Sequence, residues 1–308
     1  IERLDGVEEL FKNPIAMEEL RLNLRRIYDL ERLIGRISYG NANARDIISL
    51  KQSLAMLPQI KQVLAQFKSN ILSGFYNEMD LLEDVFQLIE DSISENPPIT
   101  LREGSIINDG YDDQLDKYRL AMTKGKDWLA ELEKKERERT GIKNLKIGFN
   151  KVFGYYLDVT KSYYDLVPEN YIRKQTLANS ERYITPELKE VEDTILGAEE
   201  KSIALEYKLF VGIRDRIASQ VIRIQKTAHI ISSLDALWSL ARVALENGYV
   251  RPYIDEGNII DIRDGRHPVV EKTLPNELFV PNNTYLDNCE NQVAIITGPN
   301  MAGKSTFM

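Results

Sequence analysis

Two apolar stripes with heptad spacing, separated by about fifty residues, constrain the fold of this chain more than any other feature. The stripes consist of Leu115, Tyr118, Met122, Gly125, Leu129 and Leu132, and of Leu188, Val191, Ile195, Ala198, Ser202, Leu205 and Leu209. Because residues spaced by three and four lie on one side of a helix, each stripe must face another helix. The stripes predict two long paired helices that carry the intervening segment away from the rest of the chain, although a seam this short is also typical of ordinary bundle packing.

The segment between the stripes changes to the alternating pattern of β-strands, with aromatic and β-branched residues in its extended stretches. Four such stretches would form a small antiparallel sheet, at residues 145–150, 152–160, 171–178 and 182–185. Pro186 then suits the first turn of the returning helix, with Thr185 as its N-terminal cap. The sequence therefore predicts a small sheet at the tip of a helical stalk.

The charge of this segment differs from that of the whole chain. Residues 139–185 carry eight Lys or Arg against four Asp or Glu, although the chain of 308 residues has a net charge of −8. A basic module on an acidic body is typical of a protein that faces a polyanion through one part only. Nucleic acid is therefore a possible partner despite the acidic total.

The remaining N-terminal part has helical periodicity, and the low Gly and Pro content favours helices over a sandwich fold. Residues 14–63 show apolar spacing by three and four, with a break near residues 35–43, and further helices are expected at 46–65 and 79–95. Neither a leader peptide nor an apolar run long enough for a membrane span is apparent, so we expect a cytoplasmic protein.

The last residues contain a complete phosphate-binding loop, G-x-x-x-x-G-K-[ST], preceded by a β-branched run at 293–297 that predicts a strand. The loop comprises Gly298, Pro299, Asn300, Met301, Ala302, Gly303, Lys304, Ser305 and Thr306. In such loops the Lys contacts the β- and γ-phosphates and the Ser binds Mg²⁺. Further short strands at 258–262 and 277–280 would open an α/β domain. Because no second strand with an acidic residue follows the loop, the chain is expected to be part of a longer protein and not to hydrolyse ATP alone.

These parts together resemble the MutS family of DNA mismatch-recognition proteins. The resemblance rests on the phosphate loop at 297–306 and on several separated motifs in the same order, at 139–141, 148–150, 154–156, 179–188 and 265–271. It covers essentially the whole chain. One departure is Ala302, where family members often have a second Gly; Ala is still small enough for close backbone approach.

The resemblance implies a mainly α fold with a small antiparallel β clamp and the start of an α/β ATPase domain. The implied lever or core domain has two segments, 1–127 and 187–249, with the clamp at 128–186 between them and the ATPase domain from 250 to 308. The family's mismatch-reading and connector domains would precede Ile1, so mismatch discrimination is not expected of this part.

The resemblance also implies the ligands and the partners. Phe279 corresponds to the adenine-stacking Phe of the family, and the loop would hold ATP, with Ser305 on Mg²⁺. The clamp would contact the DNA backbone through Lys146, Asn150, Lys151, Arg173, Lys174, Gln175 and Asn179. Expected partners of the whole protein are double-stranded DNA containing mismatches, a second copy in a homodimer and downstream mismatch-repair proteins.

Three other classes of protein remain open at this point. A branch of the same family has the ATPase and helical arms without a clamp, but the basic sheet-like insert argues against it. Chromosome-organising ATPases also join a phosphate loop to a coiled coil, yet their loop typically precedes the coil. A helical partner-binding module with an incidental loop is the third class, and it predicts no DNA binding.

Overall fold

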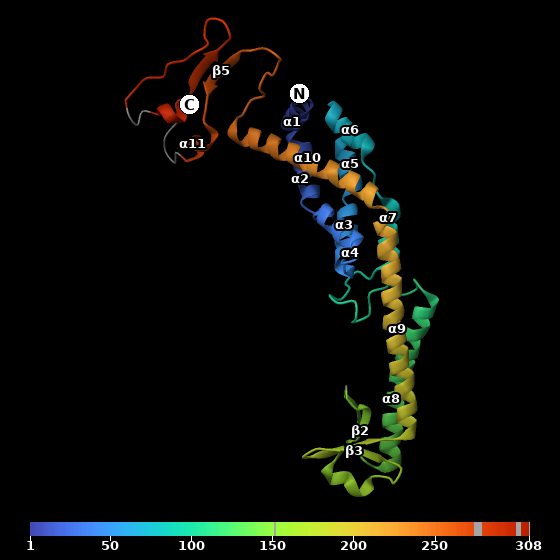
Figure 1. The fold of residues 1–308 in the computed structure, drawn as a ribbon. Coiled ribbons are helices and arrows are strands. Elements are labelled where there is room, and N and C mark those ends of the chain that lie inside the picture. Colours follow the sequence, from blue (N-terminus) through green and yellow to red (C-terminus); the bar gives the residue numbers. More distant parts are fainter. Residues whose placement is uncertain (151, 274–278, 300–302, 308) are drawn as a thin grey trace. The chain divides into compact units, whose positions relative to one another are not determined.

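The chain is mainly α-helical, with small antiparallel sheets (Figure 1). The computed structural model describes residues 1–150, 152–273, 279–299 and 303–307. Contacts divide the chain into two compact units, a larger one of Glu2–Tyr249 and a smaller one of Val250–Met308 together with Ile1. Across the described residues, no helix combines the length and the apolar character that crossing a membrane requires.

Short helices form the body of the larger unit. They are α1 (Glu2–Lys12), α2 (Pro14–Leu24), α3 (Leu30–Ser38), α4 (Ala44–Leu54), α5 (Leu57–Leu64), α6 (Asn70–Glu78) and α7 (Glu83–Ser92). Asn43 and Asp46 form a capping box that fixes the start of α4. The single helix predicted at 46–65 is wrong, because Pro58 lies in the first turn of α5, where proline starts a helix and cannot continue one.

Longer helices follow: α8 (Asp113–Thr140), α9 (Pro186–Ala218) and α10 (Val221–Asn247). Asp112 caps α8 by accepting from two backbone N–H groups, and Gly141 ends it with a left-handed φ of +71°. The predicted start of α9 is confirmed, since Thr185 caps it and Pro186 occupies its first turn. At 33 residues, α9 is about 50 Å long.

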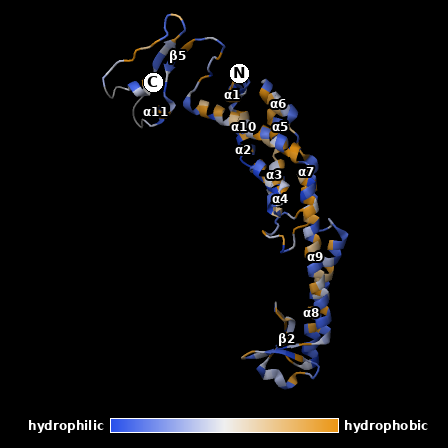
Figure 2. Cartoon of the chain, viewed as in Figure 1, coloured by the Kyte–Doolittle hydropathy of each residue, from blue (hydrophilic) through white to orange (hydrophobic). Residues whose placement is uncertain are grey.

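Helices α8 and α9 pack along each other, as the two stripes predict (Figure 1). They approach closely at Gly125, where a β-carbon would overlap the side chain of Ile195. Hydrophobic and hydrophilic residues alternate along both helices (Figure 2). In the second half of α9 the predicted Ser202 is buried, but Glu206 and Phe210 are buried one position beyond the predicted Leu205 and Leu209, which are only partly buried.

The larger unit packs around separate hydrophobic cores. One lies in the helical body and includes α10 and the C-terminal half of α9 with Phe210. Another lies where the N-terminal half of α9 and the C-terminal half of α8 meet the sheet, and it contains Leu129, Leu157, Tyr183 and Ile195. The paired helices therefore connect two independently packed regions.

The four-stranded sheet has the order β1-β2-β4-β3, with every neighbouring pair antiparallel. Its strands are β1 (Lys146–Asn150), β2 (Gly154–Thr160), β3 (Ile172–Thr176) and β4 (Ser180–Ile184), and a 3-10 helix η1 (Lys161–Leu166) connects β2 to β3. Each of the four predicted stretches overlaps a strand, although β4 begins two residues before the predicted 182–185, and the sequence pattern does not predict η1.

The smaller unit contains a two-stranded antiparallel sheet of β5 (Ile260–Gly265) and β6 (Asn282–Leu286), with the short helices α11 (Pro268–Thr273) and α12 (Lys304–Phe307). The predicted strand at 293–297 is wrong: these residues form no ladder with any described strand and are largely exposed. A β-branched run becomes a strand only when another strand supplies its hydrogen bonds. Of the predicted strand at 277–280, residues 277–278 lie outside the described part, and Phe279 and Val280 are not in a strand.

Candidate nucleic-acid interface

The two faces of the four-stranded sheet differ in character because side chains alternate along each strand. The inner face, which packs on α8 and α9, carries Ile147, Tyr155, Leu157, Val159 and Tyr183. The outer face, defined by the strand register, carries Lys146, Asn150, Tyr156, Asp158, Gln175 and Arg182. Polar and charged side chains therefore lie on the outer face, away from the hydrophobic core.

A row of four side chains crosses the outer face, one from each strand. The register aligns Lys146 with Asp158, Asp158 with Arg182, and Arg182 with Gln175. Neighbouring strands lie about 4.8 Å apart, so the row extends about 14 Å. Arg182 Nη1 donates to Gln175 Oε1 at 2.8 Å. Among the residues that the structure describes, Asp158 Oδ1 and Arg182 Nε are shielded from solvent yet have no hydrogen-bond partner.

Two residues of the outer face, Arg182 and Tyr156, are not among the predicted contacts. The Arg182 guanidinium lies over the Tyr156 ring, 4.2 Å from its centroid, in a cation–π contact. The ring in turn lies across Gly148, where a β-carbon would be 2.7 Å from it. The signal for both residues is alternation within predicted strands: Tyr156 lies between Tyr155 and Leu157 in the stretch at 152–160, and Arg182 directly precedes Tyr183 in the stretch at 182–185.

Of the predicted contacts, Lys146, Asn150 and Gln175 share the outer face. Asn150 Oδ1 accepts from Val152 N at 2.8 Å and so shapes the turn after β1. Asn179 lies exposed in the turn between β3 and β4, at the edge of the sheet. Lys151 lies outside the described residues.

Arg173 and Lys174 are placed differently from the others. Arg173 aligns with Tyr183 and therefore belongs to the inner-face side, where its Nη1 lies 3.2 Å from Glu181 Oε1. The Tyr183 hydroxyl, followed by the Arg173 guanidinium, holds the pKa of Glu181 below its usual value. Burial, together with the bond to Glu181, raises the pKa of Tyr183 to about 12. Lys174 sits at the β-bulge between Arg173 and Gln175 and is exposed.

The predicted phosphate loop lies in the smaller unit. Gly303 has a φ of +83°, a left-handed conformation that favours glycine, directly before α12. Lys304 Nζ donates to the Gly298 carbonyl oxygen at 3.0 Å, so the lysine folds back across the loop. Asn300, Met301 and Ala302 lie outside the described residues, and Pro299 and Gly298 form exposed, irregular backbone.

A hollow of about 290 Å³ brings two predicted nucleotide residues together in this unit. Phe279 and Ser305 both line it, with His267 and Phe307 beside them. An aromatic ring and a hydroxyl at the edge of the loop suit an adenine nucleotide and its metal ion. Thr306 lies in α12, but its side chain is outside the described part.

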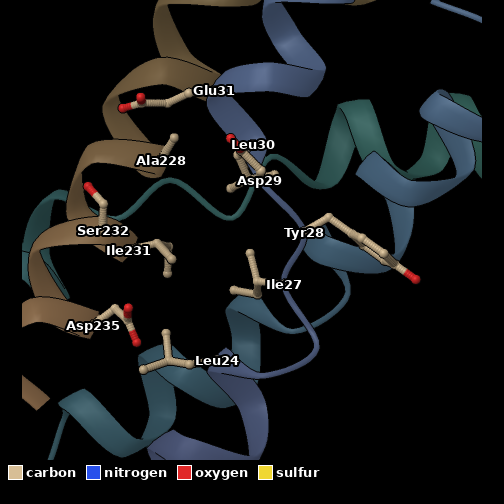
Figure 3. A pocket seen from close by; sticks show the side chains of 10 residues that line it. All are labelled: Leu24, Ile27, Tyr28, Asp29, Leu30, Glu31, Ala228, Ile231, Ser232 and Asp235. Atoms are coloured by element: carbon tan, nitrogen blue, oxygen red, sulfur yellow. The ribbon is translucent and has the colours of Figure 1, made fainter. Parts of the chain in front are cut away.

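Another hollow, of about 300 Å³, lies in the helical body between the α2–α3 connection and α10 (Figure 3). Its floor is apolar and its rim acidic, formed by Leu24, Ile27, Tyr28, Asp29, Leu30, Glu31, Ala228, Ile231, Ser232 and Asp235. Since no predicted site residue lines it and its rim is acidic, it does not extend the basic outer face of the sheet.

A family model and the similar proteins found by comparison all carry the same family name. A model of MutS family domain IV matches residues 110–201, which include α8, the whole four-stranded sheet and the N-terminal half of α9. The chain is 57% identical over 306 residues to the DNA mismatch repair protein MutS of Lachnoclostridium phytofermentans, covering 99% of this chain and 33% of that protein. The MutS proteins of Acetivibrio thermocellus and Ruminiclostridium cellulolyticum are 53% and 56% identical, over 100% and 99% of this chain and 35% of each relative. The chain thus spans about a third of the length of the curated relatives it matches.

Proposed function

Since the chain belongs to the MutS family, we propose that its four-stranded sheet binds the sugar-phosphate backbone of double-stranded DNA, and that the whole protein acts in DNA mismatch repair. The observation that carries the proposal is the outer face of the sheet, where Lys146, Arg182 and Gln175 lie in one row with Asp158, at the far end of the paired helices from the helical body. Contacts of Lys, Arg and amide side chains with phosphates position a protein on DNA without reading its sequence.

The proposed DNA contacts are unequal in electrostatic strength. Lys146 and Lys174 are exposed, and no described carboxylate lies within ion-pair distance of either. Arg173, by contrast, is paired with Glu181, and Arg182 is held by Tyr156 and Gln175. We therefore assign the main phosphate contacts to Lys146 and Lys174, with Asn150, Lys151, Arg173, Gln175 and Asn179 as additional contacts.

The test is the salt dependence of binding. Replacing Lys146 and Lys174 by Gln in the full chain should weaken binding to a labelled DNA duplex and reduce the slope of log affinity against log salt by roughly two units, because each phosphate contact releases a counterion. Fluorescence anisotropy over a salt series measures both quantities. Matched and mismatched duplexes should behave alike, since backbone contacts carry no base information.

The control variant is Lys201→Gln with Lys208→Gln, which removes the same charge from exposed positions on α9. It should leave the slope close to that of the unsubstituted chain. An equal loss of slope in both double variants would show that total charge, and not the positions of Lys146 and Lys174 on the sheet, governs binding.

We further propose ATP and Mg²⁺ as ligands of the smaller unit. The support is the hollow shared by Phe279 and Ser305 and the Lys304 ammonium at the loop. Phe279 would stack on the adenine, Lys304 would contact the phosphates, and Ser305 would bind the metal ion. When bound, the metal ion would neutralise part of the charge of the phosphates. ATP hydrolysis belongs to the proposed activity of the whole protein.

The proposal for the whole protein includes a homodimer, downstream mismatch-repair proteins as partners and the cytoplasm as its compartment. Both rival ATPase classes fit less well. The clamp-less branch has no counterpart of the four-stranded sheet, and a coiled-coil ATPase would place its phosphate loop before the paired helices, whereas here it follows them at 298–305.

A further inference from the structure

The β1–β2 hairpin is attached to both paired helices through its backbone. Ile147 N, on the edge strand β1, donates to Glu133 Oε2 of α8 at 2.7 Å. Tyr155 N, on β2, donates to Glu192 Oε2 of α9 at 2.6 Å. Tyr155 lies two residues before Leu157, the first β2 residue that is aligned with β4. One carboxylate from each helix therefore holds one strand of the same hairpin.

Both carboxylates also contact a cation on their own helix. Glu192 is only 3% exposed and pairs with Lys189. Glu133 Oε1 accepts from Arg137 Nη2 at 2.5 Å, and Arg137 Nε donates to the Leu145 carbonyl oxygen at 2.7 Å. Hydrogen bonds from a backbone N–H to an ionised carboxylate are roughly twice as strong as neutral ones. The two attachments are therefore among the stronger polar contacts of the sheet.

The hairpin backbone lies directly against Glu192. Gly154 has a φ of +75°, and a β-carbon there would overlap the Glu192 carboxylate. Gly154 aligns with Asn150, which belongs to the outer face. The hairpin turn, and the outer-face side chains of β1 with it, are therefore fixed relative to α9 by van der Waals contact as well as by the hydrogen bond.

We propose that Glu133 and Glu192 are positioning residues that set the orientation of the DNA-binding outer face from the two helices. A hydrogen bond weakens steeply when its partners separate or tilt, so the hairpin must follow both carboxylates. A displacement of α8 against α9, of the small size typical of helix shifts, would rotate β1 and move Lys146 and Asn150. The inference rests on the proposed binding of DNA by the sheet.

The experiment compares Glu, Gln and Ala at position 192 in the full chain. Glu192→Ala should weaken binding of a matched DNA duplex by at most about tenfold, because DNA binding must then supply the free energy of orienting the hairpin that one charge-assisted hydrogen bond supplies in the unsubstituted chain. Glu192→Gln, which keeps an acceptor, should weaken it about threefold, since a neutral bond is roughly half as strong. The salt slope should stay unchanged in both variants because the phosphate contacts remain. Glu133→Ala should act in the same direction.

Glu190→Ala on α9 and Glu138→Ala on α8 are matched controls, because they remove the same charge from exposed positions. Both should leave duplex affinity nearly unchanged or slightly raised. The amide resonance of Tyr155 in a ¹⁵N–¹H spectrum reports the attachment without DNA. It should move strongly upfield in Glu192→Ala and not in Glu190→Ala.

Three outcomes separate this inference from the proposed function. If Glu192→Ala shifts the Tyr155 resonance but binds the duplex as Glu190→Ala does, the carboxylate only stabilises the fold and the inference is wrong. A graded loss from Glu to Gln to Ala at constant salt slope supports it; if the Ala variant fails to fold, the Gln variant alone decides. No duplex binding by the unsubstituted chain would refute the proposed function, and the inference with it.

Discussion

Asp158 is the one acidic side chain in the row across the outer face. It lies between Lys146 and Arg182, and among the described residues its Oδ1 has no hydrogen-bond partner. A carboxylate at this position reduces the positive potential that a phosphate would meet. We therefore expect the outer face to bind DNA more weakly than it would without the charge of Asp158.

Replacing Asp158 by Asn should raise the affinity for duplex DNA. The expected gain is about threefold, because one partly exposed charge contributes up to about 1 kcal/mol. Anisotropy titration of the full chain measures it. Asp165→Asn removes the same charge from η1, whose Tyr164 packs against the inner-face core, and should have less effect. Equal gains in the two variants would contradict a specific role for the outer face.

Buried carboxylates are the residues that sequence patterns could not identify. Glu136, Glu192 and Glu206 are each at most 5% exposed. Each lies four residues after a stripe residue, Leu132, Leu188 or Ser202, and so on the buried side of its helix, but a charged residue is not expected to be buried there. Glu206 accepts from Ile106 N at 2.7 Å and from Arg119 Nη2 at 2.8 Å, and these partners lie 100 and 87 residues away in sequence. Apolar spacing predicts which side of a helix is buried, but it does not predict which charged residue on that side finds a distant partner.

At the scale of elements, the paired helices depend on one small residue at their contact. Gly125 of α8 faces Ile195 of α9 so closely that any side chain at position 125 would overlap Ile195. Glycine normally weakens a helix interior, so its presence here follows from the close approach of the two helices.

Gly125→Ala should therefore destabilise the larger unit by about 1–3 kcal/mol, the usual cost of overpacking. Urea unfolding followed by circular dichroism measures the change. Gly197→Ala is the matched control on α9: among the described residues, no atom from outside its own stretch of helix lies within 4 Å of the place a β-carbon would take. This change should stabilise the helix by about 0.5–1 kcal/mol.

A double variant tests the contact itself. Gly125→Ala combined with Ile195→Ala should be less destabilised than the sum of the two single changes, because the added methyl group then occupies space that Ile195 has left. Strict additivity of the two changes would show that α8 and α9 do not meet at these residues.

Most elements of the larger unit could be predicted from the sequence because their signals are local. The Thr185 cap and Pro186 define the start of α9, and alternation defines the four strands of the sheet. The strand predicted at 293–297 is wrong because its formation depends on a partner strand, which local pattern does not reveal. Local pattern likewise does not reveal the order of the strands or which residues share a face, because both depend on how the strands pair.

The candidate site was predictable in part for the same reason. Charge and composition indicate a basic segment at 139–185, and the structure brings Lys146, Asn150 and Gln175 to one face. From charge alone, Arg173 is expected to be a DNA contact like these three residues. The strand register, however, aligns Arg173 with Tyr183, and its guanidinium pairs with Glu181. Which face a cation occupies depends on the bulge in β3, which the sequence does not show.

At the scale of the whole molecule, the sheet has a core of its own, separate from that of the helical body. Helices α8 and α9 contribute to both cores, since α9 carries Ile195 in one and Phe210 in the other. A displacement of the helices in one region can therefore be transmitted to the other, because the same two helices pack in both cores. Helix shifts in proteins act through packed contacts of this kind. The smaller unit, with the phosphate loop, is a separate compact part.

Hydrogen–deuterium exchange of the full chain, with and without duplex DNA, tests the central claim most directly. DNA should protect backbone amides of β1, β2 and β4 and of the turn near Asn179, and high salt should abolish the protection because phosphate contacts are salt-sensitive. Matched and mismatched duplexes should give the same pattern. Protection confined to the helical body, with residues 146–184 unchanged, would contradict DNA binding by the sheet.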